Sequence, residues 1–562
     1  MASADQGGPL VVGINRTQDG SLCVMQGSRV LCCIQKERLT RQKHHWGKLG
    51  DLREVYRNTV PGLDRPIDAL VECFSSDAEA GRLADYEQEI AEVLQLAPDC
   101  KRARISHHLS HLYSVFHPSP FDEAAVMIVD GQGSPVSEFT EAWPEGQGLP
   151  GHWREVSSFY RVKRGGAIEC LGKQLYEGDA GPPVGLGMFY FLLTQAMFPG
   201  EGNEGKVMGL APHGDPDALG LPPLDVDGYK VTIPQAWREI IAVRPRFRYT
   251  PGDRSNFHDI ANLAAAGQRA FEEALLKLAH WVHEQTGLEA LCFAGGTGLN
   301  CSANDRLLRE TPFKQVFIPP APSDAGTSLG CAVYGLTELL QQPCEWHWTS
   351  DFLGPEPRLH DIEAALEAAD DLIVEKPDNL PERIVDLLVE NKVVALYQGR
   401  SEFGPRALGH RSIIGNPLQD VTRDWINARV KEREWFRPLA PIVLLEEADR
   451  FFDIRRPSPF MQFAAPVHPE AAKTIPAVTH VDCTARLQTV GEQDDPLLRQ
   501  LIQAFDARTG VPVLLNTSFN RKEEPIVETP AQAIESFRRT PMHALAMPPY
   551  LVRKRAEPDP VS

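Results

Sequence analysis

Residues 106–133, SHHLSHLYSVFHPSPFDEAAVMIVDGQG, join a histidine-rich segment to an apolar run and a glycine turn. His107 and His111 lie four residues apart, so on a helix both imidazoles leave the same face about one turn apart. The run 124–129 predicts a buried strand that delivers Asp130 into the glycine turn. Two neutral imidazoles and a carboxylate suit Fe²⁺, Mn²⁺ or Zn²⁺ better than calcium or magnesium. The stretch therefore predicts a transition-metal site, although HxxxH spacing alone is more typical of helix-packing histidines.

A second carboxylate completes this predicted cage. Residues 316–318 read as a strand, and the turn PPAPSDAG that follows places Asp324 before a helix rich in Ala, Gly and Leu. Asp324 is the fourth candidate ligand, and an ordinary helix cap is the alternative interpretation.

The composition indicates an acidic globular protein. The 562 residues, 42% of them hydrophobic, are enough for two to four domains with well-filled cores. A formal net charge of −19 disfavours a nucleic-acid partner and means that phosphate groups must be met by local basic clusters. Eleven cysteines without CxxC pairs suggest reduced thiols and a cytoplasmic location. We expect no export signal and no membrane partner, because no apolar run reaches the roughly 18 residues of a membrane span.

The N-terminal segment predicts a meander of three strands, at residues 10–14, 21–25 and 30–34. The tip between the first two strands carries Asp19, and such tips either grip phosphate or form a plain hairpin turn. The basic run that follows contains Lys43, which would either guide an anion or lie on a solvated face.

Two glycine-rich segments further along predict a nucleotide site. In EGNEGKVMGL, Lys206 is available to an anion, although a structural loop is an equal interpretation. Residues 257–287 predict a long amphipathic helix, and the strand 291–294 then runs into GGTGLN. Its glycines and the start of the next helix permit contact with ribose or phosphate, but match neither the Rossmann nor the P-loop spacing. The candidate cofactor-binding residues are Gly295, Gly296, Asn300, Lys206 and Gly131.

The second half begins at a Pro/Gly-punctuated linker, residues 351–357, which predicts a domain boundary to within about ten residues. A strand at 392–397 feeds a glycine loop in which Arg400 and Arg406 could grip a phosphate, or could make surface ion pairs. The basic candidates continue with Lys431, Arg433 and Arg437 before a strand at 440–445, and with Arg486. Ser518 and Asn520, after a strand at 511–515, would supply neutral hydrogen bonds at a loop opening.

Taken in order, the motifs resemble one family. SHHLSH, VDGQGS, EGKVMGLAPHG, AGGTGLN and PPAPSDAGTSLG resemble the N-terminal domain of the antibiotic O-carbamoyltransferases, a family that includes tobramycin and nodulation-factor enzymes. GRSEFGPRALGHRSIIGNP, KEREWFRPLAPIV and NTSFN resemble its YrdC-like C-terminal domain. The resemblance implies an α/β fold, with an actin/sugar-kinase-like (Kae-like, ASKHA) domain at residues 1–350 and a YrdC-like α/β domain at 351–562.

The resemblance also implies an activity. Members of the family make a carbamoyl-adenylate from carbamoyl phosphate and ATP, with Mg²⁺, and pass the carbamoyl group to a hydroxyl. Arg406, Lys431, Arg486, Ser518 and Asn520 align with the residues that form the adenylate, and the ion expected in the N-terminal cage is Fe²⁺ or another divalent transition metal. The expected acceptor is a small-molecule natural product, an uncharged macrolide or ansamycin polyketide ahead of an aminoglycoside, and a homodimer is left open.

One departure from the family pattern concerns the general base. The family usually has a histidine in the first hairpin tip, whereas this chain has Gln18, which cannot take a proton. The base is then Asp19 or another group, with Lys43 as a further catalytic candidate, or the metal alone activates the alcohol.

Two other functions share parts of the pattern. A threonylcarbamoyl-modifying ATPase acting on tRNA would have both fold types, but the charge of −19 disfavours it. A non-enzymatic binding protein with a vestigial ATPase fold is disfavoured because Arg406, Lys431, Ser518 and Asn520 are all present.

Overall fold

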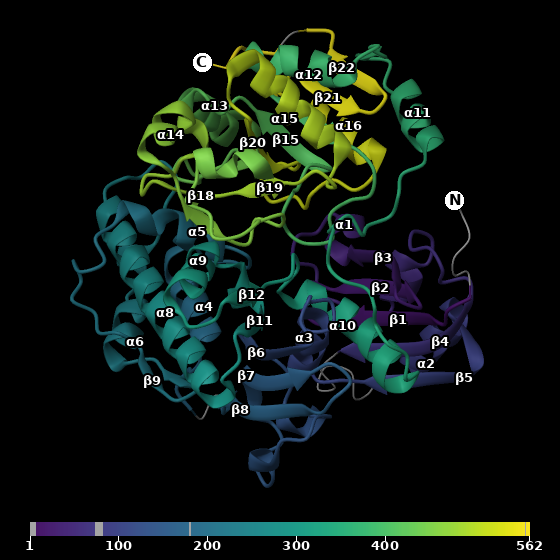
Figure 1. Cartoon of the computed structure of the whole chain (residues 1–562), viewed down its shortest axis with the longest axis vertical. Helices are drawn as coiled ribbons and strands as arrows, with labels where there is room; N and C mark the ends of the chain where they lie inside the picture. Colours follow the sequence, from purple (N-terminus) through teal and green to yellow (C-terminus); the bar gives the residue numbers. More distant parts are fainter. Residues whose placement is uncertain (1–6, 74–82, 179–180, 557, 562) are drawn as a thin grey trace. The chain divides into compact units, whose positions relative to one another are not determined.

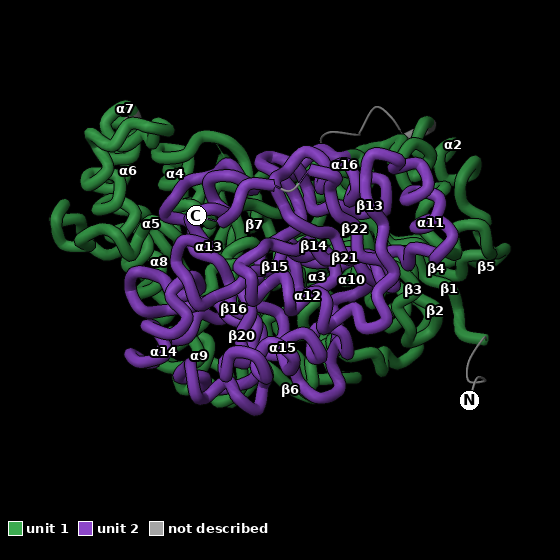
Figure 2. The backbone as a smooth tube through the Cα atoms, turned by 90° about the horizontal axis from the view of Figure 1, so that it is seen from above, with its two compact units in different colours: residues 1–40, 44–349 green, residues 41–43, 350–562 purple. Residues whose placement is uncertain are grey.

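The computed structural model describes residues 7–73, 83–178, 181–556 and 558–561, and it divides into two compact units (Figure 2). Unit 1 comprises Met1–Thr40 and His44–Thr349, and unit 2 comprises Arg41–Lys43 and Ser350–Ser562. Unit 2 thus includes a three-residue segment from near the N-terminus, which no sequence pattern indicated.

The first sheet of unit 1 has five strands in the order β3-β2-β1-β4-β5 (Figure 1). The first three form an antiparallel meander, and β4 and β5 add to it in parallel. Both faces of β1 are buried, as its unbroken apolar sequence LVVGI requires. The strands are β1 (Leu10–Asn15), β2 (Ser21–Gln26), β3 (Arg29–Gln35), β4 (Pro66–Cys73) and β5 (Gln95–Arg104), with helices α1 (Lys36–Thr40) and α2 (Leu83–Val93) between them.

The second sheet of unit 1 repeats this plan, in the order β12-β11-β6-β7-β8. An antiparallel meander is again followed by two parallel strands, so β6 corresponds to β1 and β11 corresponds to β4. This repeated mixed sheet is the actin/sugar-kinase-like architecture, and the predicted fold class is confirmed. The strands are β6 (Glu123–Val129), β7 (Arg154–Lys163), β8 (Ile168–Tyr176), β11 (Ala290–Ala294) and β12 (Gln315–Phe317).

Two helices pack on these sheets and on each other. α10 (Thr327–Tyr334) lies against β1, β2 and β4, whereas α3 (His107–Val115) lies against β6, β7 and β11. They approach so closely that a Cβ added at Gly330 would lie 1.8 Å from the Ser110 carbonyl oxygen. A glycine is therefore required at position 330 for this packing.

The remaining helices of unit 1 surround α8 (Phe257–Thr286), which confirms the long helix predicted at 257–287 (Figure 1). α8 packs against α4, α5 and α9, and it ends where Gly287 adopts a left-handed conformation. The other elements are α4 (Leu186–Met197), α5 (Glu204–Leu210), α6 (Gln235–Ala242), α7 (Arg244–Phe247), α9 (Cys301–Glu310) and the pair β9 (Asp225–Asp227) and β10 (Lys230–Thr232).

Unit 2 is built on one eight-stranded mixed sheet in the order β13-β22-β21-β14-β15-β20-β16-β19. The strands are β13 (Leu372–Glu375), β14 (Val394–Tyr397), β15 (Arg411–Gly415), β16 (Ala440–Leu444), β19 (Gln488–Val490), β20 (Val513–Ser518), β21 (Ala544–Met547) and β22 (Tyr550–Lys554). A separate pair is formed by β17 (Ala464–Pro466) and β18 (Thr484–Arg486).

Helices cover both faces of this sheet, because successive strand residues enter two different cores. Ala395 packs in one core, whereas Val394 and Leu396 pack in the other. The first core includes residues of α11 (Leu359–Glu367), α13 (Asp420–Trp425), α14 (Pro469–Thr474) and α16 (Pro530–Arg538), and the second includes residues of α12 (Leu380–Val389) and α15 (Pro496–Thr509).

Two sequence predictions need correction in unit 2. The strand predicted to end at residue 515 continues to Ser518, so Ser518 is the last strand residue and pairs with Ser412. Arg400 was a candidate phosphate ligand, but its guanidinium donates to the carbonyl oxygens of Leu353 and Gly354 at 2.7 Å each. Arg400 therefore ties the segment that starts unit 2 to the β14–β15 loop.

Among the described residues, no helix has the length and apolar character that crossing a membrane demands.

Candidate metal centre and anion site

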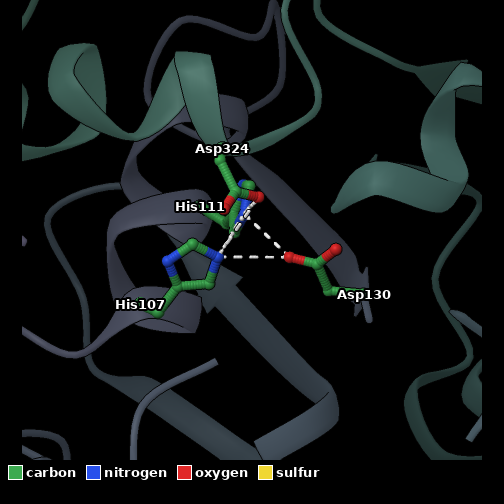
Figure 3. Close-up of side chains that lie close together, drawn as sticks. All are labelled: His107, His111, Asp130 and Asp324. Atoms are coloured by element: carbon green, nitrogen blue, oxygen red, sulfur yellow. Dashed lines mark hydrogen bonds and ion pairs between the residues drawn. The ribbon is translucent and has the colours of Figure 1, made fainter. Parts of the chain in front are cut away.

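The four predicted ligands of unit 1 converge (Figure 3). The Nε2 atom of His107 lies 3.2 Å from Oδ2 of Asp130 and 3.5 Å from Oδ1 of Asp324. The Nε2 atom of His111 lies 3.3 Å and 3.9 Å from the same two oxygens. One donor atom from each residue lies within 4.8 Å of the others, so a single ion can contact all four.

Separate elements bring these side chains together. Both histidines project from the same face of α3, as their spacing predicts, and Asp130 directly follows β6. Asp324 is the first residue of a 3₁₀ turn, Asp324–Gly326, whose N-cap residue is Ser323, and the N-cap residue of α10 is Gly326. The interpretation of Asp324 as a simple helix cap is therefore wrong.

Backbone amides orient the Asp130 carboxylate. Its Oδ1 atom accepts hydrogen bonds from the amides of Gly131, at 2.8 Å, and Gly296, at 3.0 Å. Its Oδ2 atom is thereby turned to the two imidazoles. Two of the candidate cofactor-binding residues, Gly131 and Gly296, thus hold a metal-ligand candidate in place.

The charged groups of the cluster shift one another's pKa values. Burial alone would raise the pKa of Asp130, but hydrogen bonds and charge from His107 and His111 hold it well below its usual value. Burial would lower the pKa of His107, yet Asp324 and Asp130 hold it well above its usual value. Burial, with the charge of Asp130 adding to it, raises the pKa of Asp324. A cation among the four would relieve the repulsion between the two carboxylates.

The donor set fits a transition metal. Two imidazole nitrogens and two carboxylate oxygens suit Fe²⁺, Mn²⁺ or Zn²⁺, whereas Ca²⁺ and Mg²⁺ prefer all-oxygen shells. All four side chains are buried or nearly so, which keeps competing water from the donors.

The other three candidate cofactor-binding residues each make different contacts. Gly295 has φ +95° and donates to the Pro322 carbonyl oxygen at 2.8 Å, and a Cβ there would lie 2.2 Å from the Val129 carbonyl oxygen. Asn300 caps α9 through its side chain and also bonds Gln268. Lys206 places its ammonium 5.7 Å from the centre of the Phe198 ring.

Asp19, the candidate base, is paired with a residue that the sequence reasoning missed. Its Oδ1 atom lies 2.8 Å from Nδ1 of His44, and the backbone amide of His44 donates to Glu37. The Asn15 amide group donates to the carbonyl oxygens of both Asp19 and Asp324. The hairpin tip is thus joined to the metal-ligand turn. The sequence feature that could have indicated His44 was its position directly after Lys43, itself a catalytic candidate.

In unit 2, three of the five predicted adenylate-forming residues meet. The ammonium of Lys431 donates to the Ser518 carbonyl oxygen at 2.6 Å, to the Ser518 hydroxyl at 3.1 Å and to the Asn520 carbonyl oxygen at 3.0 Å. The Ser518 hydroxyl in turn donates to the Asn520 side-chain oxygen. The end of β20 therefore fixes the buried side-chain nitrogen of Lys431.

Other cations gather around Lys431. Burial first, and then the charges of Arg433, Lys43 and Arg437, hold the pKa of Lys431 well below its usual value. The pKa of Arg437 is lowered by burial and by Arg486, against the opposing charge of Glu434. We call this set the cation cluster: Lys43, Lys431, Arg433, Arg437 and Arg486. Arg406, half-buried in the β14–β15 loop, is the fifth adenylate-forming candidate.

The chain matches known proteins along most of its length. Residues 83–333 match the family model described as carbamoyltransferase N-terminus, and residues 385–554 match carbamoyltransferase C-terminus. Nodulation protein NolO of Bradyrhizobium diazoefficiens is 36% identical over 80% of this chain and 79% of its own. Nodulation protein NolNO of Sinorhizobium fredii is 32% identical over 96% of this chain and 79% of its own. With both domain models matched in order, the chain belongs to the carbamoyltransferase family.

Proposed function

We propose that this carbamoyltransferase is an ATP-dependent O-carbamoyltransferase, in which unit 2 makes a carbamoyl-adenylate and unit 1 transfers its carbamoyl group to a natural-product hydroxyl. The observation that carries the proposal is the cation cluster. Burial, together with the charges of neighbouring cations in this cluster, lowers the pKa of Lys431, Arg433 and Arg437, so a multiply charged anion would stabilise the cluster. Carbamoyl phosphate and the triphosphate of ATP are such anions.

The chemistry proposed for unit 2 needs no nucleophilic side chain. Water cleaves carbamoyl phosphate to carbamate and phosphate, and a carbamate oxygen then attacks the α-phosphorus of ATP in line as pyrophosphate leaves. Lys431, Arg437 and Arg486 would neutralise charge on the reacting phosphates, and Mg²⁺ that arrives with ATP would add positive charge there. Ser518 and Asn520 orient Lys431 through the contacts described above.

In unit 1, His107, His111, Asp130 and Asp324 would hold Fe²⁺ or another divalent transition metal. Bound there, the metal would supply Lewis acidity toward the adenylate. Asp19, hydrogen-bonded to His44, is the proposed base that takes the proton of the acceptor hydroxyl. The acceptor oxygen bonds to the carbamoyl carbon, and AMP leaves with the electron pair. An uncharged polyketide is the acceptor class that we propose first.

The test separates the two half-reactions. Protein, ATP and carbamoyl phosphate should release pyrophosphate, and candidate alcohols should gain the mass of a carbamoyl group. Lys431→Met should lose pyrophosphate release, whereas Asp324→Asn should keep it and lose transfer. Lys473→Met is the matched control, because Lys473 lies exposed on α14 with its ammonium near Glu470. Failure of the wild-type protein to release pyrophosphate would refute the proposal.

A further inference from the structure

Lys173, on β8, is a charged side chain sealed inside unit 1. Its side chain is 0% exposed, and its ammonium lies 2.6 Å from Glu141 and 2.7 Å from Glu155. Burial alone would lower the pKa of Lys173, but the two carboxylates hold it well above its usual value. Neither the sequence motifs nor the proposed chemistry uses this buried triad.

The two carboxylates reach the first turn of α3, the helix that carries the histidine ligands. Oε1 of Glu155 accepts hydrogen bonds from the backbone amides of His108, at 2.9 Å, and Ser134, at 3.2 Å. Oε2 of Glu141 accepts the hydroxyl of Ser106, the residue at the N-cap of α3, at 2.8 Å.

Ser134 links this network to His107, one of the metal-ligand candidates. Its hydroxyl accepts the backbone amide of His107 at 3.0 Å, while its own amide is held by Glu155. The Ser158 hydroxyl lies 3.1 Å from the Lys173 ammonium and 2.7 Å from Nδ1 of His108. Two consecutive backbone amides of α3, at His107 and His108, therefore depend on acceptors that Lys173 organises.

The physical need for such acceptors is general. The first amides of a helix have no partner within the helix, and a Ser at the N-cap usually supplies one. The Ser106 side chain makes no cap hydrogen bond, because its hydroxyl donates to Glu141 instead. Glu155 and Ser134 take over the capping, and a carboxylate at this end also suits the helix dipole. Two buried carboxylates repel each other, so the arrangement requires a buried cation.

We propose that Lys173 is a positioning residue of the metal centre: through Glu155, Glu141 and Ser134 it sets the first turn of α3 and thereby the place of His107. The proposal rests on the metal centre assigned to His107, His111, Asp130 and Asp324. A purely structural ion pair would affect folding alone, whereas a positioning residue also sets metal affinity. Partners that orient a metal ligand without touching the metal typically change affinity 10–100-fold when removed.

The test compares metal binding by Lys173→Met and by Lys163→Met, its matched control. Lys163 ends the neighbouring strand β7 with its side chain exposed. Each protein is titrated without oxygen with Co²⁺ alone, whose visible absorption reports ligand geometry, and with Fe²⁺. We expect Lys163→Met to match the wild type, and Lys173→Met to bind both ions about 10–100-fold more weakly with an altered Co²⁺ spectrum. Lys173→Arg, which keeps the charge, should recover part of the affinity.

Ser134→Ala keeps the proposal testable if Lys173→Met does not fold. This variant removes only the hydroxyl that accepts the His107 amide, and we expect a several-fold loss of affinity with the fold retained. The proposal is overturned if a folded Lys173→Met protein binds the metal with an affinity within twofold of the wild type. If only Ser134→Ala folds, the same result for that variant overturns it. If the wild-type protein binds neither ion, the metal centre itself is refuted together with the role of Lys173. Pyrophosphate release, assigned to unit 2, is unaffected by either result.

Discussion

The Nε2 atoms of His107 and His111 lie 3.2 Å apart, and both face the same carboxylate oxygen of Asp130. Two imidazole nitrogens this close need a proton or a cation between them, since their lone pairs repel. The helix supplies the spacing, but Gly131 and Gly296 supply the orientation of the carboxylate. The convergence of these atoms is the basis of the first prediction.

Asp324→Asn should lose the metal. The amide cannot replace the negative charge among the donors, and a direct ligand should count at least as much as its supporting partners, so we expect affinity to fall by about 100-fold or more. Metal content after anaerobic dialysis against Fe²⁺ measures this. Asp227→Asn, on the exposed end of β9, is the control and should retain the wild-type content. Full metal content in Asp324→Asn would remove Asp324 from the ligand set.

Carbamoyl phosphate binding should take up a proton at Lys431. Burial and neighbouring cations lower the pKa of Lys431, so in the ligand-free protein its amine is neutral above that lowered pKa. A bound anion raises the pKa again, and Lys431 then takes up a proton. Affinity should therefore fall as the pH rises through the lowered pKa. Calorimetry in two buffers with different heats of ionisation reports the uptake. An uptake that persists unchanged in Lys431→Met would assign the proton to another group.

Acid should weaken unit 1 through His117. Burial, followed by the charge of Arg164, lowers the pKa of His117 from 6.5 to about 4. The unfolded chain therefore binds a proton between pH 6.5 and 4 that the folded chain excludes, so stability falls as the pH drops through this window. At pH 5 the cost is about 2 kcal/mol.

The measurement for His117 is the urea midpoint of unit 1 at pH 7 and pH 5. His117→Phe keeps a flat ring at the position where His117 stacks on Tyr113, with ring centroids 4.8 Å apart. This variant should lose less stability than the wild type when the pH falls from 7 to 5. Equal acid sensitivity of the two proteins would show that His117 is not buried in its neutral form.

Gly330→Ala should push α10 away from α3. The added Cβ would lie 1.8 Å from the Ser110 carbonyl oxygen, and overpacking of this kind costs about 1–3 kcal/mol. Gly205→Ala, in α5, meets no atom within 4 Å and should be neutral or slightly stabilising. Thermal unfolding compares the two variants. A Gly330→Ala protein as stable as the wild type would mean that the two helices can separate at no cost.

Local pattern was enough to predict much of this protein. The His107–His111 spacing, the strand leading to Asp130 and the long helix at 257–287 follow from periodicity within a few residues. The same reasoning could not show that Arg400 bonds the backbone carbonyls of Leu353 and Gly354, because these partners lie more than forty positions away in the chain. Nor could it find Lys173, whose partners are Glu141 and Glu155.

What the sequence determined by itself is the chemistry available at each point and the local geometry of helix and strand, because both depend on residues a few positions apart. Only the tertiary structure decided which distant points meet. The pairing of Ile128 with Ala294 sets Asp130 beside Gly296, and the turn after β12 brings in Asp324. These meetings depend on strand register and helix packing, which are set by burying the apolar faces of the whole unit together.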